Sequence, residues 1–480
     1  MSRPNVLLIC TDHWPGPLMG AMGHDRILTP TLNQIAGNGI LFTQAYTATP
    51  TCIPARRALM TGATARTHGD RVFQEHLPMD PNLPTMPQVF RQAGYQASAV
   101  GKLHVYPQRD RIGFDEALIC EEGRHHLGGG KDDYELFLQD QGYPGQELTH
   151  AMCNNEYTVR PWHLPEHCHP THWTTREMCR TIERRDPTRP AFWYCSYIGP
   201  HPPIVPPADY LDMYQRLGVD EPCMGDWARD FDAWPYALKR HQGGPRFTIP
   251  ANATETRLAR MGFYAQCTYI DHQIRLLLGQ LREAGILDDT ILMFTADHGD
   301  MLGNHGLWCK PPMHEGSAKI PMILVPAASC DAGHHVRDDR LAELRDVMPT
   351  LLDLCGIPCP DSVEGHSLIS GPRRSHLYCE HWEDERALRM VRAGRHKLIW
   401  YPVGNRLQLF DLDADPNELT DLSADPELAG LRASLEEMLE GELYGDDERW
   451  VVDGKLTGEP DIAYEPQPNR RLSGQRGWRF

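Results

Sequence analysis

The sequence lacks an excess of positive charge, and it lacks a long hydrophobic run near its start. Its 480 residues include 47 Lys and Arg against 65 Asp and Glu, which gives a formal net charge of −18. This balance argues against a nucleic-acid-binding surface and offers no attraction to anionic membranes. The apolar run at residues 6–10 ends just before the carboxylate of Asp12. Because it is too short for a signal-peptide core or a membrane span, we expect a cytoplasmic protein that binds neither nucleic acid nor membranes.

Closely paired cysteines are also lacking. The chain has 14 cysteines, but none forms a C-x-x-C pair, and the nearest approach is Cys355 with Cys359. Without an export signal, such thiols are expected to stay reduced and to pack as small hydrophobic side chains. Internal repeats and low-complexity tracts are absent from the sequence as well.

What the chain does contain is the pattern of an α/β protein. A hydrophobic content of 41% with 23% charged residues is typical of a soluble globular protein with a full core. Short apolar runs that resemble buried parallel strands lie at residues 6–10, 97–100, 191–198, 290–295 and 321–325. A helical repeat spans residues 256–284 and stops at Gly285. This alternation predicts a mostly parallel central sheet flanked by helices.

The length favours one large domain and a smaller one. Residues 120–250 are rich in Pro, Gly, Trp and His, and we interpret them as loops and insertions that decorate the sheet. After residue 370 the pattern changes to short segments typical of antiparallel strands. We therefore predict a catalytic domain at residues 1–370 and a smaller α+β domain with an antiparallel sheet at residues 371–480.

Polar side chains follow four of the predicted strands. Ligands of open α/β sheets bind beyond the carboxyl ends of the strands. Taken singly, such an Asp is more often a helix cap and such a His more often satisfies a backbone carbonyl, but four strand ends with the same character indicate an active site. Asp and His together would also suit a divalent cation. The residues concerned are Asp12, His13, Lys102, His104, His201, Asp297, His298, His305 and Lys310.

The stretch "PTCIPARRALMTG" at residues 50–62 adds a thiol to this picture. Pro54 suits the first turn of a helix, so Cys52 is expected near the positive end of the helix dipole. Arg56, four residues further on, lies on the same helix face. A thiolate of lowered pKa is one outcome. A soft thiolate fits poorly beside hard-cation ligands, however, which suggests that the reacting group is not a thiol.

These motifs resemble the sulfatase family of the alkaline-phosphatase superfamily, which includes arylsulfatases, choline-sulfatase-like enzymes and phosphonate monoester hydrolases. The first family motif is C-x-P-x-R followed by T-G, here "CIPARRALMTG". Further matches are "GYQASAVGKLH", "PHPP", "TADHG", "LGNHGLWCK" and the closing "LFDLDADPNELTDLSADPE". The resemblance spans nearly the whole chain in the right order and implies an alkaline-phosphatase-like fold.

The resemblance also implies a modified nucleophile and a metal ion. In this family a maturation enzyme oxidises the cysteine to formylglycine (3-oxoalanine), whose hydrate attacks the ester, so Cys52 would be a precursor. One divalent cation is expected, Ca²⁺ first, with Mn²⁺ or Mg²⁺ as alternatives. Its implied ligands are residue 52 with Asp12, Asp297 and His298; His13 stands where relatives often have Asp, Gln or Asn, and is either a ligand or a neighbour of the ligands.

Roles for the remaining groups follow from the same resemblance. Arg56 would hold the formylglycine hydrate, and Lys102 and Lys310 would bind ester oxygens. His104 would take the proton that lets the enzyme-bound ester collapse, and His201 would stabilise the leaving oxygen. A homo-oligomer is expected from the family alone.

Several alternatives stay open at this point. The first hypothesis is a sulfuric ester hydrolase, and the second is a phosphonate monoester or phosphodiester hydrolase on the same scaffold. A third is a catalytically silent binding protein with an unmodified Cys52. The His- and Trp-rich stretch at residues 162–173 is either a substrate-pocket or interface loop or, less in keeping with the family motifs, a zinc site.

Overall fold

The protein is described here by a computed structural model that covers residues 3–150, 152, 155–243, 249–310 and 312–466. Its centre is an eight-stranded sheet in the order β4-β3-β5-β1-β6-β7-β2-β8. Seven strands share one direction, and β7 runs antiparallel to both of its neighbours. The strands are β1 (Asn5–Asp12), β2 (Ile40–Tyr46), β3 (Gln96–Gly101), β4 (Glu116–Ile119), β5 (Ala191–Pro200), β6 (Thr290–Ala296), β7 (Met322–Val325) and β8 (Val336–Glu343).

All five predicted strands are present, but one expectation about them is wrong. The sequence predicts a parallel strand at residues 321–325, whereas β7 is antiparallel to β6 and to β2. The cause is the connection from β6 to β7, which carries only short helical turns and no long crossover helix. Without a crossover, the chain re-enters the sheet from the edge at which it left, so the strand must run in the opposite direction.

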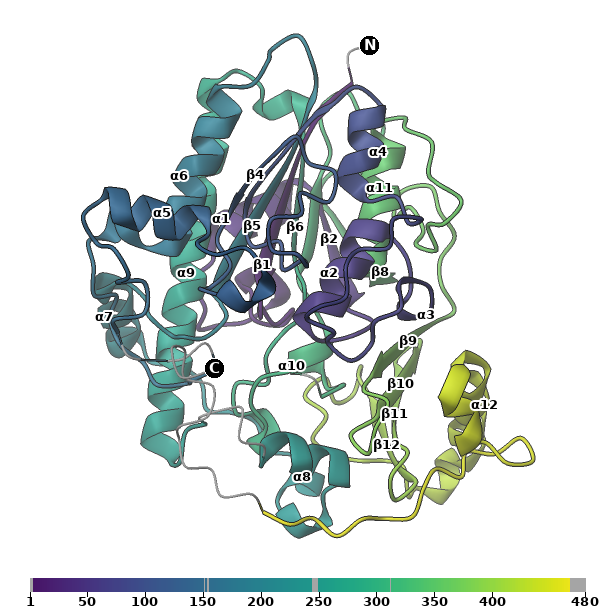
Figure 1. The fold of residues 1–480 in the computed structure, drawn as a ribbon. Helices are drawn as coiled ribbons and strands as arrows, with labels where there is room; N and C mark the ends of the chain where they lie inside the picture. The colour runs from purple at the N-terminus through teal and green to yellow at the C-terminus, as the bar shows by residue number, and fades with distance from the viewer. Residues whose placement is uncertain (1–2, 151, 153–154, 244–248, 311, 467–480) are drawn as a thin grey trace.

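Helices cover both faces of the sheet (Figure 1). On one face, α9 (Ala253–Glu283) and α6 (Pro170–Glu183) pack against β5 and against each other, with α1 (Pro30–Asn38) and α7 (Ala208–Leu217) beside α9. On the other face lie α2 (Cys52–Thr61), α4 (Met86–Gln92) and α11 (Val347–Leu354). The layered α/β architecture predicted from the sequence is confirmed.

The long helix α9 begins slightly earlier than its apolar repeat indicates. The side chain of Asn252 accepts a hydrogen bond from the backbone N–H of Glu255 at 3.0 Å, which caps the helix. Gly285, just past the other end, has a φ of +68°, the left-handed conformation expected of a glycine after a helix.

Residues 120–250 contain more helix than their composition suggests. Besides β5, α6 and α7, this region forms α5 (Asp133–Asp140) and α8 (Tyr236–Gln242) among its described residues. The remaining short helices of the chain are α3 (Ala65–His68) and α10 (Glu315–Ala318). In the part of the chain that the structure describes, no helix combines the length and the apolar character needed to cross a membrane.

The C-terminal region forms a second, antiparallel sheet in the order β12-β11-β10-β9, as predicted. Its strands are β9 (His376–His381), β10 (Leu388–Ala393), β11 (His396–Tyr401) and β12 (Arg406–Asp411). Successive residues alternate between its two faces. Ile399 packs toward the main domain, and Leu398 packs toward α12 (Ala429–Glu442), which lies beside this sheet in Figure 1.

Candidate active site

Four neighbouring strands deliver the polar groups to one edge of the large sheet. In the order β3-β5-β1-β6, these strands end at or immediately before Lys102, His201, Asp12 and Asp297. Their side chains are buried, with Asp12 and Asp297 fully inaccessible to solvent. These four residues, which the sequence places after strands, therefore lie at neighbouring strand ends, as expected.

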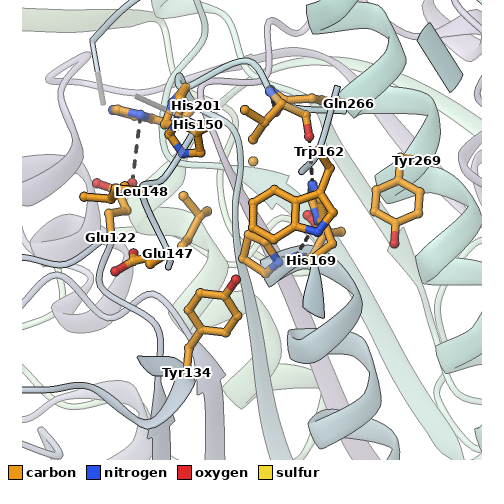
Figure 2. Close-up of a pocket in the computed structure, with 16 residues that line it drawn as sticks. Glu122, Tyr134, Glu147, Leu148, His150, Trp162, His169, His201, Gln266 and Tyr269 are labelled. Atoms are coloured by element: carbon orange, nitrogen blue, oxygen red, sulfur yellow. Dashed lines mark hydrogen bonds and ion pairs between the residues drawn. The ribbon is translucent and has the colours of Figure 1, made fainter. Parts of the chain in front are cut away.

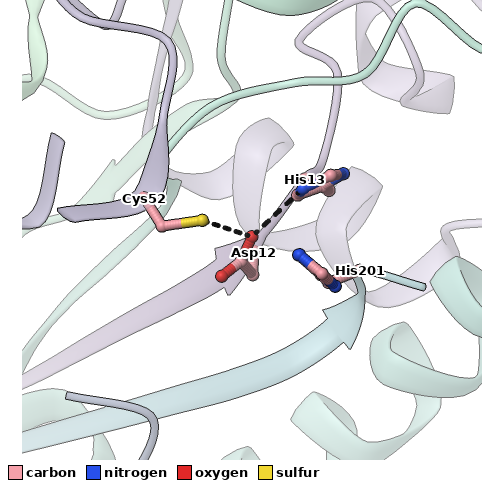
Figure 3. Close-up of side chains that lie close together, drawn as sticks. All are labelled: Asp12, His13, Cys52 and His201. Atoms are coloured by element: carbon pink, nitrogen blue, oxygen red, sulfur yellow. Dashed lines mark hydrogen bonds and ion pairs between the residues drawn. The ribbon is translucent and has the colours of Figure 1, made fainter. Parts of the chain in front are cut away.

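Helix α2 adds Cys52 to the same edge, and Figure 3 shows its side chain pointing at Asp12. Cys52 is the first residue of α2, near the positive end of the helix dipole, and the N-cap of this helix is Thr51. The sulfur lies 3.8 Å from Asp12 Oδ1 and 3.3 Å from His298 Nε2. Lys310 Nζ donates to it at 3.3 Å. Residue 52 thus sits at a helix N-terminus among a carboxylate, an imidazole and an ammonium group.

Arg56, one turn further along α2 than residue 52, bridges the two aspartates. Its Nε donates to Asp297 Oδ2 at 2.9 Å, and its Nη2 donates to Asp12 Oδ2 at 3.3 Å. Its Nη1 donates to Ser196 Oγ at 2.9 Å and to the carbonyl of Lys102 at 3.0 Å. The guanidinium therefore fixes both aspartates relative to the ends of β3 and β5.

The two aspartates differ in acidity. Burial, followed by the neighbouring charge of Asp12, raises the pKa of Asp297 to about 6. For Asp12, burial acts in the same direction, but the cations around it, Lys102 above all, hold its pKa well below the usual range. Asp12 is therefore an anion at neutral pH. A cation placed between the two aspartates would lower the pKa of Asp297 and so stabilise its ionised form.

Four potential ligand atoms converge here, from Asp12, Cys52, Asp297 and His298. His298 Nδ1 lies 2.9 Å from the carbonyl oxygen of Gly299, so that nitrogen carries the ring proton. Nε2 then carries a lone pair and can only accept, yet it faces two other acceptors, Asp12 Oδ1 at 3.5 Å and Asp297 Oδ1 at 3.7 Å. Acceptors that face one another in a buried site need a cation between them. The donor set therefore fits a divalent metal ion.

His13 borders this cluster from the end of β1. It also belongs to a second group of candidate ligand atoms, with Asp12, Cys52 and His201. Its backbone is left-handed, with a φ of +70°, which turns the ring back over the strand end. Its Nε2 lies 3.7 Å from Asp12 Oδ1 and also contacts the ammonium of Lys310. Figure 3 shows His13 and His201 beside Asp12.

Lys102 and His104 occupy the other side of the cluster. Lys102 Nζ lies 2.6 Å from Asp12 Oδ2 and 2.8 Å from Glu122 Oε1. Burial and the adjacent cations, Arg124 first, hold the pKa of His104 well below its usual value, so the ring is neutral. Neither ring nitrogen of His104 has a hydrogen-bond partner among the described residues. The neutral imidazole thus has a lone pair that is not used by any described residue, while the adjacent cations lower its basicity.

His201 and Lys310 form the third side. Lys310 Nζ lies 3.2 Å from His201 Nε2, and His201 Nδ1 is hydrogen-bonded to the carbonyl of Pro202. Burial and the charge of Lys310 hold the pKa of His201 well below its usual value. His305, in contrast, lies apart from the cluster and accepts a hydrogen bond from the backbone of Gly225 at 3.1 Å.

A pocket adjoins the cluster at His201 and Glu122 (Figure 2). Aromatic rings and aliphatic side chains form most of its wall. Three of its polar groups are occupied elsewhere: Tyr134 donates to the carbonyl of Cys168 at 2.7 Å, His169 contacts the carbonyl of Val205 at 3.1 Å, and Gln266 donates to the carbonyl of Pro200 at 3.0 Å. The pocket therefore presents apolar faces, and none of its described lining residues is Lys or Arg.

This pocket accounts for part of the His- and Trp-rich stretch. Trp162 and His169 line the pocket, and His169 also caps α6 by accepting from the backbone of Thr171 at 3.1 Å. Among the described residues, no group of converging ligand atoms includes a side chain from 162–173. The structure thus favours the pocket interpretation over a zinc site.

Sequence reasoning missed two carboxylates of the site. Glu122 pairs with Lys102 and follows the end of β4, so the same strand-end rule applied to residues 116–119 would have found it. Asp300 contacts His13 and lies three residues after Asp297, directly after the family match "TADHG". Nothing in its spacing distinguishes it from an ordinary turn aspartate.

A helix N-terminus that carries Cys52 and two aspartates at the carboxyl edge of a mostly parallel sheet are typical of an alkaline-phosphatase-like hydrolase scaffold. Comparison with known proteins agrees with that class. The profile of the sulfatase family matches residues 4–357, and a profile described as N-sulphoglucosamine sulphohydrolase, C-terminal, matches residues 303–443. The chain belongs to the sulfatase family.

Individual relatives span almost the whole chain. An arylsulfatase of Clostridium perfringens is 34% identical over 95% of this chain and 97% of its own length. A choline-sulfatase of Rhizobium meliloti is 28% identical over 88% of this chain and 83% of its own. Among solved structures, a phosphonate monoester hydrolase from Silicibacter pomeroyi has the same fold, with a TM-score of 0.77 and 22% identity over 94% of this chain and 96% of that one.

Proposed function

We propose that this protein hydrolyses sulfate esters to free sulfate and an alcohol or phenol, with residue 52 as the nucleophile. The observation that carries the proposal is the position of Cys52, at the first turn of α2 and in contact with Asp12, His298 and Lys310. Its sulfur stands in for the oxygens of formylglycine. Once oxidised, residue 52 supplies a hydrated aldehyde, whose one oxygen attacks the ester and whose other allows sulfate to be expelled by elimination.

The surrounding residues bind the ester and move its protons. Lys310, and Lys102 on the opposite side, neutralise the non-bridging oxygens of the sulfate group. The neutral ring of His104 accepts the proton that is released when the nucleophile is regenerated. The Lys310–His201 pair holds a proton beside residue 52, where it stabilises the oxygen of the departing alcohol.

The same proposal includes a metal ion and a maturation enzyme. Asp12, Asp297, His298 and residue 52 would hold a divalent cation, which supplies Lewis-acid neutralisation of sulfate charge. The carboxylates favour Ca²⁺, with Mn²⁺ or Mg²⁺ as alternatives. A formylglycine-generating enzyme is the required partner. A homo-oligomeric state rests on the family.

The pocket beside His201 supports an uncharged leaving group. A second sulfate or carboxylate on the alcohol would meet apolar faces and the carboxylates of Glu122 and Glu147, with no Lys or Arg among the described lining residues to receive it. Aromatic side chains such as Trp162 and Tyr134 suit a flat apolar ring. We therefore propose aryl or other apolar sulfate esters rather than polysulfated sugars as substrates.

A second candidate is hydrolysis of phosphonate monoesters or phosphodiesters on the same scaffold. These esters are also singly charged anions, and Lys102 is already engaged by Asp12 and Glu122. Such a charge balance suits a monoanion better than a dianionic phosphate monoester. The likeness in fold to phosphonate monoester hydrolases is in keeping with this candidate.

Parallel kinetics on three 4-nitrophenyl substrates test the proposal. Matured protein should show its highest kcat/KM with the aryl sulfate, lower values with a phosphonate monoester and a phosphodiester, and none of these activities after Cys52→Ala. A preference for either phosphorus substrate would establish the second candidate. Inactivity of fully matured protein toward all three would leave a binding protein without catalysis.

A further inference from the structure

The ring of His13 is held between two groups of opposite charge. Its Nδ1 lies 2.9 Å from Asp300 Oδ2, and its Nε2 contacts Lys310 Nζ. His13 and Asp300 are at most 1% exposed, and Lys310 is 8% exposed. Because a carboxylate can only accept hydrogen bonds, Nδ1 of the neutral His13 ring must carry the proton. Nε2 then has a lone pair and acts as an acceptor.

Asp300 is itself fixed on both oxygens. Oδ2 also accepts a hydrogen bond from the hydroxyl of Tyr157, and Oδ1 accepts from the backbone N–H groups of Leu302 at 2.9 Å and Cys309 at 3.0 Å. The last of these bonds closes the loop immediately before Lys310. One carboxylate therefore sets both the path of this loop and the tautomer of His13.

The ammonium of Lys310 has three donors and meets three acceptors. These are His13 Nε2, Cys52 Sγ at 3.3 Å and His201 Nε2 at 3.2 Å. His201 accepts for the same reason as His13, because its Nδ1 is bound to the carbonyl of Pro202. Two rings with fixed tautomers and residue 52 thus determine where the ammonium lies.

We propose that Asp300, supported by Tyr157, is a positioning residue that acts through His13 to hold Lys310 against residue 52. The proposal rests on the proposed function, because Lys310 faces the ester only if residue 52 is the nucleophile. It also assigns His13. The lone pair of His13 receives the ammonium of Lys310, so His13 is not a ligand of the metal ion, which Asp12, residue 52, Asp297 and His298 hold.

The substitution Asp300→Asn tests this chain of contacts. The amide retains an acceptor for the backbone of Leu302 and Cys309 but presents an N–H to His13. The proton of the His13 ring then moves to Nε2. The N–H at Nε2 faces the N–H groups of Lys310, so this contact becomes repulsive. We expect kcat to fall by roughly 10–100-fold, as for other residues that orient catalytic groups, while the metal content measured by mass spectrometry stays that of the wild type.

Two further measurements separate positioning from a structural role. The control Asp271→Asn removes another buried carboxylate that accepts two backbone N–H groups, from Thr31 and Leu32, and that belongs neither to the candidate ligand groups nor to the pocket lining; it should leave kcat unchanged. His13→Gly suits the left-handed backbone at this position and offers no ligand atom. The double variant with Asp300→Asn should be no slower than His13→Gly alone, because Asp300 acts through His13.

Either of two results would overturn the inference. Loss of the metal ion in His13→Gly would make His13 a ligand, and additive rate losses in the double variant would show that Asp300 acts independently. The rate comparison uses whichever substrate the wild type turns over best, so it stays meaningful if that substrate is a phosphonate. The metal content is measured without any substrate. If no substrate is turned over, the proposed function fails, while metal content still tests the assignment of His13.

Discussion

At the scale of single residues, the candidate metal site mixes one soft group with three hard ones. Asp12, Asp297 and His298 offer oxygen and nitrogen, whereas Cys52 offers sulfur. Ca²⁺ and Mg²⁺ bind oxygen and avoid thiolates. Replacing the sulfur by aldehyde-hydrate oxygens would remove the soft ligand and leave three oxygen donors and one imidazole nitrogen, so the chemical character of its neighbours argues for oxidation of residue 52.

A ligand substitution tests this site directly. His298→Ala removes the Nε2 lone pair that faces Asp12, so bound metal should fall below one ion per chain. Activity should drop by roughly 1,000-fold, because several kcal/mol of charge stabilisation are lost with the ion. Metal analysis and kcat/KM measured on the same sample check both expectations.

His305→Ala is the matched control, since it removes a buried histidine from the same loop but outside the ligand group. It should keep one metal ion per chain. Equal metal contents in the two variants would contradict the assignment of His298.

How far the sequence predicts a site residue depends on what that residue contacts. Asp12, Lys102, His201 and Asp297 were identified because each follows a strand, and the sheet brings strand ends together. Asp300 could not be identified in this way. Its role comes from a hydrogen bond to His13, 287 positions away, and such a bond leaves no local pattern.

At the scale of elements, the end of β3 shows how closely the backbone is packed near the site. Gly101 precedes Lys102 and has a φ of +108°. A Cβ at this position would lie 1.8 Å from the carbonyl oxygen of Ser196 in β5, closer than any contact allows. The glycine is therefore required for β3 and β5 to approach each other at the edge where Lys102 leaves the sheet.

A pair of glycine substitutions tests this packing. Gly94, before β3, also has a positive φ, of +93°, but a Cβ at that position would have no neighbouring atom within 4 Å. Gly94→Ala should lower the free energy of unfolding by about 1 kcal/mol through backbone strain alone. Gly101→Ala should lower it by about 2–4 kcal/mol, because overpacking is added. Urea unfolding of both variants measures the difference, and equal losses would contradict the close approach of β3 and β5.

The elements that the sequence predicted are those with continuous apolar runs. Strands β1, β5 and β6 are buried along most of their length and read as hydrophobic segments. Three strands were missed. β8 was missed because "VRDDRLAE" carries charged residues along most of its length before the buried end, β4 because it has only four residues, and β2 because the apolar run of "ILFTQAY" is only three residues long. The direction of β7 could not be predicted, since it depends on the path of the preceding loop.

At the scale of the whole molecule, a buried ionic cluster joins the two sheets. Lys397 of β11 lies 2.8 Å from Glu315 of α10 and 2.6 Å from Glu418, which follows β12. Glu315 also accepts a hydrogen bond from Tyr46, at the end of β2, at 2.8 Å. Burial, partly offset by Lys397, raises the pKa of Glu418 to about 7. Lys397 contacts both carboxylates, while Lys319 pairs with Glu315 alone, at 3.3 Å.

Lys397→Met should therefore lower the free energy of unfolding by about 3–5 kcal/mol at neutral pH. Without the ammonium, both carboxylates would take up protons more readily in the folded than in the unfolded state. A raised folded pKa makes stability fall as pH rises above the unfolded value of about 4.5. The loss in free energy of unfolding of Lys397→Met, relative to the wild type, should thus be larger at pH 8 than at pH 5.

Urea unfolding at these two pH values, beside the exposed control Lys455→Met, measures the effect. A deficit that does not depend on pH would mean that lost packing, not charge, explains the change.

The central claim is that residue 52 acts as an oxidised cysteine, and peptide mass spectrometry tests it most directly. Trypsin releases residues 27–56, which contain Cys52 as their single cysteine. In protein co-expressed with a maturation enzyme and active on its ester, this peptide should be about 18 Da lighter than the cysteine form, as expected for the aldehyde. A fully active preparation whose peptide retains the mass of unmodified cysteine would contradict the account.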